Sequence, residues 1–269
     1  LGLHGAIGAV ERHSQSLQAM PTLGNSVTSE LFTPGSYWQL LTGINGYAEI
    51  KGAGLATQAA TGRCFEVLDS LEQENSLQQT ARLRVRLLED GYPCWLDPVE
   101  LQGQVVQQKA WQPQLLTVKK IQQRLIAVMN WVEAAAAQPN TYLWGGSLGP
   151  DFDCSGLVQT AFASQGIWIP RDAYQQERFC TPITVQPDNT KQLRPGDLIF
   201  FGSRHRCSHV GLYVGNGSYW HSSGQEHGRN GIGCDRLPAH DTHPVACYYR
   251  AELRGAGRVE RCHDGTTLP

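Results

Sequence analysis

One cysteine in the second half of the chain stands where a nucleophile is expected. Cys154 follows Asp153 at a predicted junction between a loop and a helix, so its thiol would lie at a helix N-terminus. The helix dipole favours negative charge there, and such thiols beside an imidazole can have a pKa lowered from about 8.5 to about 3.5–7.5. The pattern therefore indicates a thiolate nucleophile, with a core-packed structural cysteine as the alternative.

Two histidines could complete this chemistry. His209 and His221 lie on strand candidates 209–214 and 218–221, which the Gly-Asn-Gly segment 215–217 separates. Asn-Gly is a strong hairpin signal, and a hairpin would bring the two imidazoles close together. A nucleophile, a base and a third group that orients the base form the general arrangement for covalent acyl transfer. The three residues together therefore predict an acyl-transfer site.

The elements around these residues predict an α+β domain over residues 115–250. Apolar residues recur at helical spacing along Leu115–Ala137, and a second helix is expected over 153–165. Helices first and strands afterwards are typical of an α+β domain with an antiparallel sheet. The strand candidates of this sheet are 197–201, 209–214, 218–221 and 245–249.

A different pattern precedes this domain. In 81–88, apolar residues alternate with three arginines, which indicates a half-buried strand. With further strand candidates at 44–50 and 63–69, and turn signals between them, residues 42–101 are predicted to form a small all-β barrel. The remaining segments are a poorly ordered leader, a linker and a tail: 1–41, 102–114 and 251–269.

Composition argues against several classes of function. Lys and Arg total 22 against 24 Asp and Glu, a net charge of -2, so the basic excess that nucleic-acid binding needs is missing. The longest apolar stretch, Leu125–Ala137, is shorter than the roughly 20 residues of a membrane span. Eight cysteines without any C-x-x-C spacing indicate reduced thiols rather than a disulfide scaffold or a zinc knuckle.

The N-terminal residues give information on the cellular compartment of the protein. They lack the basic start, the apolar segment and the cleavage site of a secretory signal, which predicts a cytoplasmic protein. Because the sequence begins with Leu1 and Met20 is a candidate start, a place in the cell envelope stays open.

Six motifs in the predicted α+β domain resemble, in order, those of the NlpC-type cell-wall cysteine peptidases. They are Tyr-Leu-Trp-Gly-Gly (142–146), Asp-Cys-Ser-Gly-Leu-Val (153–158), Pro-Arg-Asp-Ala-Tyr-Gln-Gln (170–176), Arg-Pro-Gly-Asp-Leu-Ile-Phe-Phe (194–201), Ser-His-Val-Gly-Leu-Tyr-Val-Gly (208–215) and Tyr-Trp-His-Ser-Ser-Gly (219–224). The barrel, with Leu-Glu-Asp-Gly-Tyr-Pro-Cys-Trp-Leu (88–96), resembles the SH3-like domain of cyanobacterial γ-D-glutamyl-L-diamino acid endopeptidases. The likeness covers about residues 42–250.

The resemblance implies a papain-like fold and a role for each catalytic candidate. Cys154 would be the nucleophile, His209 the general base and His221 the group that orients the base. Tyr142 would lie beside the nucleophile. For Tyr142 and Trp144 the alternative is a place in an aromatic core.

The resemblance also implies a substrate site. Asp153 and Ser155 would line it, and Asp172 would receive the free α-amine of the substrate, unless it only caps a helix. Tyr92 of the barrel would close this amine pocket. Two further residues are candidates for a second carboxylate there: Glu89 and Asp90. Gly91 and Cys94 depart from the family pattern, which leaves the geometry of the turn beside Tyr92 open.

The function that follows from the resemblance is that of a cysteine endopeptidase. It would hydrolyse, without a cofactor, the γ-D-glutamyl-L-diamino acid (diaminopimelate) bond of murein stem peptides with a free N-terminal L-Ala. One alternative is a non-catalytic murein-binding protein, against which the intact cysteine and histidines argue. Another is a zinc-dependent hydrolase with Cys154, His209 and His221 as ligands, which the spacing does not exclude. Acyl transfer on lipids would need an amphipathic anchor that the sequence lacks.

Overall fold

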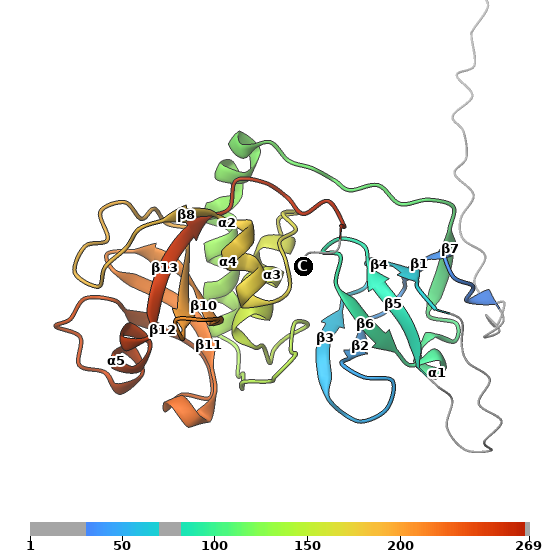
Figure 1. The fold of residues 1–269 in the computed structure, drawn as a ribbon, viewed down its shortest axis with the longest axis horizontal. Helices are drawn as coiled ribbons and strands as arrows, with labels where there is room; N and C mark the ends of the chain where they lie inside the picture. The colour runs from blue at the N-terminus through green and yellow to red at the C-terminus, as the bar shows by residue number, and fades with distance from the viewer. Residues whose placement is uncertain (1–30, 70–81, 267–269) are drawn as a thin grey trace, which may run out of the picture.

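The computed structural model describes residues 31–69 and 82–266, which form two lobes side by side (Figure 1). Most of the predicted leader, the start of the predicted strand at residue 81 and the last three residues of the predicted tail lie outside the described residues. Within the described residues the fold is α+β, and the pairings in both sheets are antiparallel, as predicted.

The first lobe is a small seven-stranded β structure with the order β3-β2-β6-β5-β4-β1-β7. The predicted alternation is confirmed in β5, where Leu83, Val85 and Leu87 are buried while Arg84 and Arg86 point away from the core. Its elements are β1 (Tyr37–Leu40), β2 (Ile44–Tyr47), β3 (Leu55–Ala59), β4 (Cys64–Val67), β5 (Leu83–Leu87), β6 (Pro93–Leu96), α1 (Pro98–Leu101) and β7 (Val105–Gln108).

The barrel extends beyond the predicted bounds at both ends. Strand β1 lies in the segment predicted as leader and pairs with β4 and β7, while β7 lies in the segment predicted as linker. Each strand is four residues long and carries polar residues such as Gln39 and Gln107, so neither shows a sustained hydrophobic period. Buried Trp38 and Val105 nevertheless attach them to the core of the barrel.

The second lobe is a six-stranded sheet, in the order β12-β11-β10-β9-β13-β8, between helices. Its strands are β8 (Thr181–Ile183), β9 (Leu198–Gly202), β10 (Cys207–Gly215), β11 (Ser218–Ser223), β12 (Gly231–Arg236) and β13 (Leu253–Arg258). One face, with Leu198 and Phe200, packs in a core with three helices: α2 (Val118–Ala136), α3 (Cys154–Ala163) and α4 (Ala173–Phe179). The opposite face, with Ile199 and Phe201, packs against α5 (Pro244–Ala251).

The segment 245–249 is helical, so its prediction as a strand is wrong. Pro244 takes the first turn of α5, where its missing N–H costs nothing, and Val245, Ala246 and Tyr249 are buried at helical spacing. The run is rich in residues that favour strands, but it is too short for its period to distinguish the two conformations.

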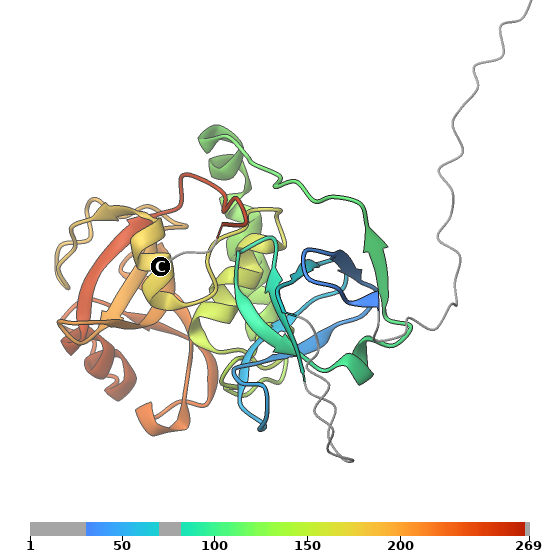
Figure 2. The ribbon, with the colours of Figure 1, turned by 45° about the vertical axis from the view of Figure 1, so that its right-hand side comes forward.

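Two chain segments cross between the lobes (Figures 1 and 2). The linker after β7 leads to α2, and the segment after β13 returns toward the barrel. The predicted tail therefore contains β13, which lies between β9 and β8 in the sheet, and a return segment anchored by a hydrogen bond from the His263 N–H to the Trp168 carbonyl. A Cβ on Gly265 would collide with the Leu88 carbonyl of the barrel, so this segment reaches the first lobe.

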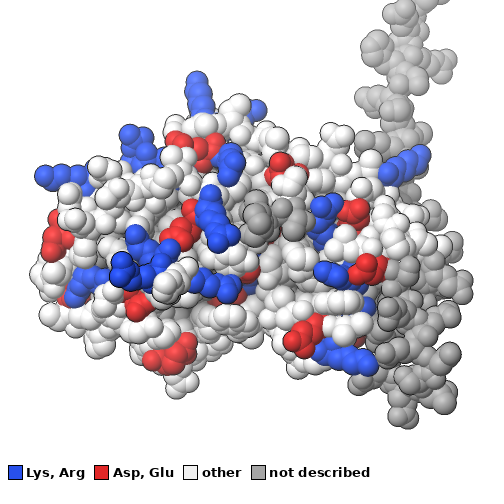
Figure 3. All heavy atoms as spheres, in the orientation of Figure 1, with Lys and Arg blue, Asp and Glu red and all other residues white. Residues whose placement is uncertain are grey.

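The distribution of charged side chains and the lengths of the helices agree with the near-zero net charge and the short apolar stretches of the sequence. Basic and acidic side chains are interspersed over the face shown in Figure 3. Among the described residues, no helix combines the length and the apolar character that a membrane crossing requires.

Candidate active site

Cys154 is the first residue of α3, as the sequence predicts. Asp153 is the N-cap, and its carboxylate accepts a hydrogen bond of 2.6 Å from the Gly156 N–H. Helix α3 packs on β10, and the Cys154 Sγ lies 4.0 Å from the carbonyl oxygen of Ser208, the residue before His209. The nucleophile candidate and the histidine strand are thus brought into contact by the packing of helix on sheet.

The thiol does not have the lowered pKa expected from the helix terminus. Burial and the charge of Asp153 raise the pKa of Cys154 to about 12, although the backbone N–H groups of Val210 and Ser155 act in the opposite direction. The side chain is only 6% exposed, so desolvation outweighs the dipole at this site. The free protein therefore holds a neutral thiol.

The two histidines meet as the hairpin prediction requires. His209 Nε2 lies 2.8 Å from His221 Nδ1, and His221 Nε2 lies 2.7 Å from Asp235 Oδ2. We call His209, His221 and Asp235 the imidazole relay. All three are buried, and burial lowers the pKa of both histidines, so both are neutral near pH 7.

Asp235 is a member of the site that the sequence analysis missed. Strand β12 pairs Gly233 with His221, which places Asp235 on the same face two residues away. Burial opposes ionisation of Asp235, but its bond to His221 and the guanidinium of Arg229, 2.7 Å away, hold its pKa below the usual range. Glycines at alternate positions of β12 give it no hydrophobic period, which is why neither the strand nor its aspartate was predicted.

One set of tautomers satisfies the whole relay. An ionised Asp235 accepts from His221 Nε2–H, which leaves His221 Nδ1 to accept from His209 Nε2–H. The remaining nitrogen of His209, Nδ1, then carries a lone pair. The hydrogen bonds of the relay thus leave His209 Nδ1 able to accept a proton from a neighbouring acid.

Aromatic residues surround this base. The ring of Tyr249 on α5 stacks on His209 at a centroid distance of 4.0 Å, and its hydroxyl bonds Ser223. A hollow of about 190 Å³ beside His209 is also lined by Tyr142, Trp144 and Tyr249. Trp144 is 73% exposed, so it is not part of a core. The sequence pattern does not point to Tyr249, because it predicts a strand over 245–249 where the structure has a helix.

A contact between the lobes brings together Tyr92 and Asp172, the two residues of the predicted amine pocket. The Tyr92 hydroxyl donates to Asp172 Oδ1 at 3.4 Å. Asp172 precedes α4, but its side chain makes no capping bond, and burial raises its pKa against the opposing charge of Arg171. Gly91 has a φ of +66°, and a Cβ there would collide with the Thr266 carbonyl, which accounts for the departure from the family pattern.

Asp153 and Ser155 lie at the site but are engaged within the protein. Arg171 donates to both oxygens of Asp153, at 3.0 and 2.7 Å, and to the Ser155 hydroxyl at 3.0 Å. It also donates to Thr57 of the barrel. These bonds fix the start of α3 and tie it to the first lobe.

Glu89 and Asp90 do not provide a second carboxylate beside Asp172. Both are buried and pair with Arg63 of the barrel, at 3.1 and 2.7 Å. Asp90 also accepts from Gln159 of α3. The sequence indicated two acids near Tyr92, but the cation that binds them lies 26 residues earlier, at a distance that gives no local signal.

The arrangement does not fit the zinc alternative. A metal bound by both histidines needs their ring nitrogens to converge on it, whereas His209 and His221 bond each other and His221 uses its other nitrogen for Asp235. Within the ranges 31–69 and 82–266, no group of three His, Cys, Asp or Glu side chains is placed to hold a metal ion.

A helix that begins with a cysteine, followed along the chain by antiparallel strands with paired histidines, defines the papain-like α+β class. Within this class the chain carries an NlpC/P60 domain, because residues 139–242 match the NlpC/P60 family. Residues 46–101 match the bacterial dipeptidyl-peptidase SH3 domain. The resemblance is confirmed for both domains, while the likeness to cyanobacterial enzymes stays a prediction.

Similar proteins carry the names of peptidases. The chain is 43% identical over 96 residues to the bifunctional muramidase/DL-endopeptidase CwlT of Bacillus subtilis, a match that covers 34% of this chain and 27% of that protein. It is 41% identical over 87 residues to a γ-D-glutamyl-L-lysine dipeptidyl-peptidase of Bacillus cereus, covering 30% and 24%. The chain thus spans about a quarter of the length of these two relatives. The match to the solved structure of an NlpC/P60 family protein from Bacillus cereus covers 85% of this chain and 65% of that protein, at 22% identity and a TM-score of 0.41.

Proposed function

We propose that this chain is a cysteine peptidase that hydrolyses the bond between γ-D-glutamate and a diamino acid in murein stem peptides with a free N-terminal L-Ala. The observation that carries the proposal is the position of the Cys154 thiol against the strand of His209, with the imidazole relay behind that base. The name of the Bacillus cereus relative supports the class of bond.

The first half-reaction forms a thioester. His209 Nδ1 takes the thiol proton as the Cys154 sulfur bonds to the scissile carbonyl carbon, and the electron pair of the C=O bond moves to oxygen. Backbone N–H groups at the start of α3 stabilise this oxyanion. The C–N bond then breaks, and His209 gives its proton to the leaving amine of the diamino acid.

Water completes the cycle. His209 takes a proton from a water molecule whose oxygen attacks the thioester carbon, and the C–S bond breaks as the sulfur regains a proton. The products are the γ-carboxylate of glutamate and the regenerated thiol. During both steps Asp235 and His221 stabilise the proton on His209.

The amine pocket would set the cleavage position. Asp172 offers a partly buried carboxylate to the ammonium of L-Ala, and Tyr92 limits the space beyond it. N-acetylation removes the charge and adds bulk where the pocket ends. A partly buried carboxylate without its cation costs on the order of 3–5 kcal/mol, so acetylated peptide should be cut at least about a hundredfold more slowly.

The test compares L-Ala-γ-D-Glu-diaminopimelate with its N-acetylated form, with products followed by mass spectrometry. Release of diaminopimelate identifies the bond that is cut. Tyr92→Ala should reduce the difference between the hydrolysis rates of the two peptides. Tyr92→Phe keeps the ring and should preserve most of this rate difference. Equal rates on both peptides in the unchanged protein would contradict the amine pocket, and products cut elsewhere would contradict the bond assignment.

A further inference from the structure

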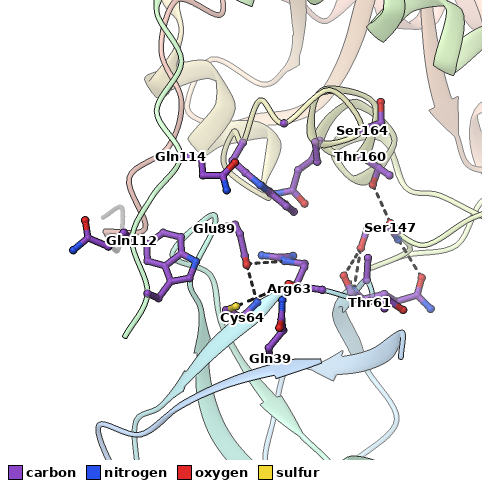
Figure 4. Close-up of a pocket in the computed structure, with 18 residues that line it drawn as sticks. Gln39, Thr61, Arg63, Cys64, Glu89, Gln112, Gln114, Ser147, Thr160 and Ser164 are labelled. Atoms are coloured by element: carbon purple, nitrogen blue, oxygen red, sulfur yellow. Dashed lines mark hydrogen bonds and ion pairs between the residues drawn. The ribbon is translucent and has the colours of Figure 1, made fainter. Parts of the chain in front are cut away.

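A second cavity lies between the lobes, on the barrel side of α3. It has a volume of about 580 Å³ and is lined by the barrel, the linker and helix α3 (Figure 4). None of the residues that line it belongs to the imidazole relay, and neither Tyr92 nor Asp172 lines it. Its volume lies within the range of about 300–1,000 Å³ that is typical of small-molecule sites.

The charges at the cavity are engaged with one another. Among the described residues that line it, only Arg63 and Glu89 are charged, and they pair at 3.1 Å. Arg63 also pairs with Asp90 at 2.7 Å, so one guanidinium serves two carboxylates, which are further bonded by the Cys64 N–H and by Gln159. An ionic ligand would therefore have to separate existing buried pairs, which is costly. The lining favours a neutral ligand.

The uncharged part of the lining is rich in side-chain amides and hydroxyls. Figure 4 shows Gln114, Thr160 and Ser164 across the cavity from Gln39 and Thr61, with Gln112 at its side. An amide presents donors and an acceptor together, and a hydroxyl does the same. Thr160 and Ser164 already donate to backbone carbonyls, so they offer a ligand acceptor oxygens. The Gln39 amide is bonded to Gly62 and Gln108, whereas the amides of Gln112 and Gln114 can both donate and accept. This wall can therefore match a ligand that carries both kinds of group around its rim.

Two indole rings add apolar faces to this polar wall. Trp111 of the linker and Trp168 both line the cavity and are partly exposed. The guanidinium carbon of Arg63 lies 4.7 Å from the Trp168 ring centre, and the return segment packs at Trp111 through Gly265. Both rings are thus held in place by the protein itself, which lowers the cost of ordering them around a ligand.

We propose that the interdomain cavity binds a neutral sugar, and that an N-acetylated amino sugar fits it best. A sugar ring combines an apolar C–H face, which matches an indole, with a rim of hydroxyls that both donate and accept. An acetamido group adds an amide that pairs with the glutamine side chains. This site is separate from the peptide site and does not depend on the proposed peptidase function.

The experiment is calorimetric titration of the full chain carrying Cys154→Ala with N,N′-diacetylchitobiose, a neutral disaccharide. Saturable binding to one site is expected. Trp111→Ala removes a stacking face and Thr61→Arg, at an exposed barrel position, blocks the cavity; each should weaken binding roughly tenfold or more. Trp144→Ala is the matched control, because this exposed indole lies beside His209, and it should leave sugar binding unchanged.

Several results would overturn the proposal. These are the absence of saturable binding at millimolar sugar, loss of binding in Trp144→Ala with retention in Trp111→Ala, and equal or tighter binding of the cationic, deacetylated disaccharide. Circular dichroism of each variant shows that its fold is kept. Since the protein used has no nucleophile, failure here leaves the peptidase test untouched.

Discussion

The candidate active site and the domain interface are both buried and polar, yet burial affects the charges of their side chains in opposite ways. At the site, burial lowers the pKa of His209 and raises that of Cys154, so the reactive pair rests neutral. At the interface, burial works against Arg63, but the charges of Asp90 and Glu89 outweigh it and raise its pKa. The thiol proton can therefore pass to His209 at the candidate active site, whereas the second group is a fixed ionic cluster within the barrel that contacts Gln159 and Trp168 of the second lobe.

Removal of the nucleophile should have the largest effect. Cys154→Ala is expected to lower the rate of peptide hydrolysis by roughly 10⁴-fold or more, because the covalent step disappears. Rates are measured by mass spectrometry of the released diamino acid. Cys94→Ala is the matched control and should keep most activity, since its buried thiol lies in the core of the barrel. Inactivation by an alkylator that labels Cys207 while Cys154 stays free would show that the nucleophile is misassigned.

The relay should show a graded loss. His209→Ala removes the proton carrier and is expected to lower kcat by roughly 10²- to 10⁴-fold. His221→Ala should cost less, because it removes only orientation and charge support. Steady-state kinetics on the free peptide measure both variants. A larger loss at His221 would reverse the two roles.

The ionic cluster should matter for stability rather than for chemistry. Arg63→Ala leaves Glu89 and Asp90 buried without a cation and should lower the free energy of unfolding by about 3–5 kcal/mol. Urea denaturation measures the change. Arg84→Ala is the control, because its pair with Asp69 is exposed and should contribute about 0–1 kcal/mol. If both variants lower the free energy of unfolding equally, the buried cluster does not stabilise the fold more than an exposed ion pair does.

The neutral histidines should make the fold sensitive to acid. The unfolded chain takes up protons on His209 and His221 as the pH falls through about 6.5, whereas the native state resists them. The contribution of the two neutral histidines to the free energy of unfolding should thus be fully present above about pH 6.5. As the pH falls below about 6.5, the free energy of unfolding should decrease by at most about 1.4 kcal/mol per pH unit for each imidazole. Urea midpoints at pH 7.5 and 5.5 test this. His209→Asn should flatten the slope, and a protein that gains stability on acidification would contradict the expectation.

Sequence reasoning succeeded where one short segment carried both the chemistry and its geometry. Cys154 follows its own N-cap, and the Asn-Gly turn brings His209 to His221, so local rules were sufficient. The contacts at the interface were not predictable, because Arg63 and Asp90 meet only when β4 pairs with β5, and Arg171 reaches Thr57 across the domain boundary. Such pairs are chosen by tertiary packing, which leaves no period in the sequence.

The predictions for several short elements were wrong for a related reason. β1, β7 and β12 are short or glycine-rich, so their hydrophobic pattern is too brief to register. The segment 245–249 carries strand-forming residues but becomes a helix, because Pro244 starts it and one face must cover Phe201. Because the helix was not predicted, Tyr249, whose ring stacks on His209, was not predicted as part of the site either.

The return of the chain from β13 to the barrel has a consequence for binding. The linker joins the barrel covalently to the second lobe, so docking of the lobes is an intramolecular association, and the return segment adds non-covalent contacts at Leu88 and Trp111. For short tethers the effective concentration of one partner at the other is in the millimolar range, and the contacts of the return segment restrict the orientation of the barrel as well. Tyr92 should therefore remain at Asp172 in the absence of peptide, and cutting the return segment should raise KM before it changes kcat.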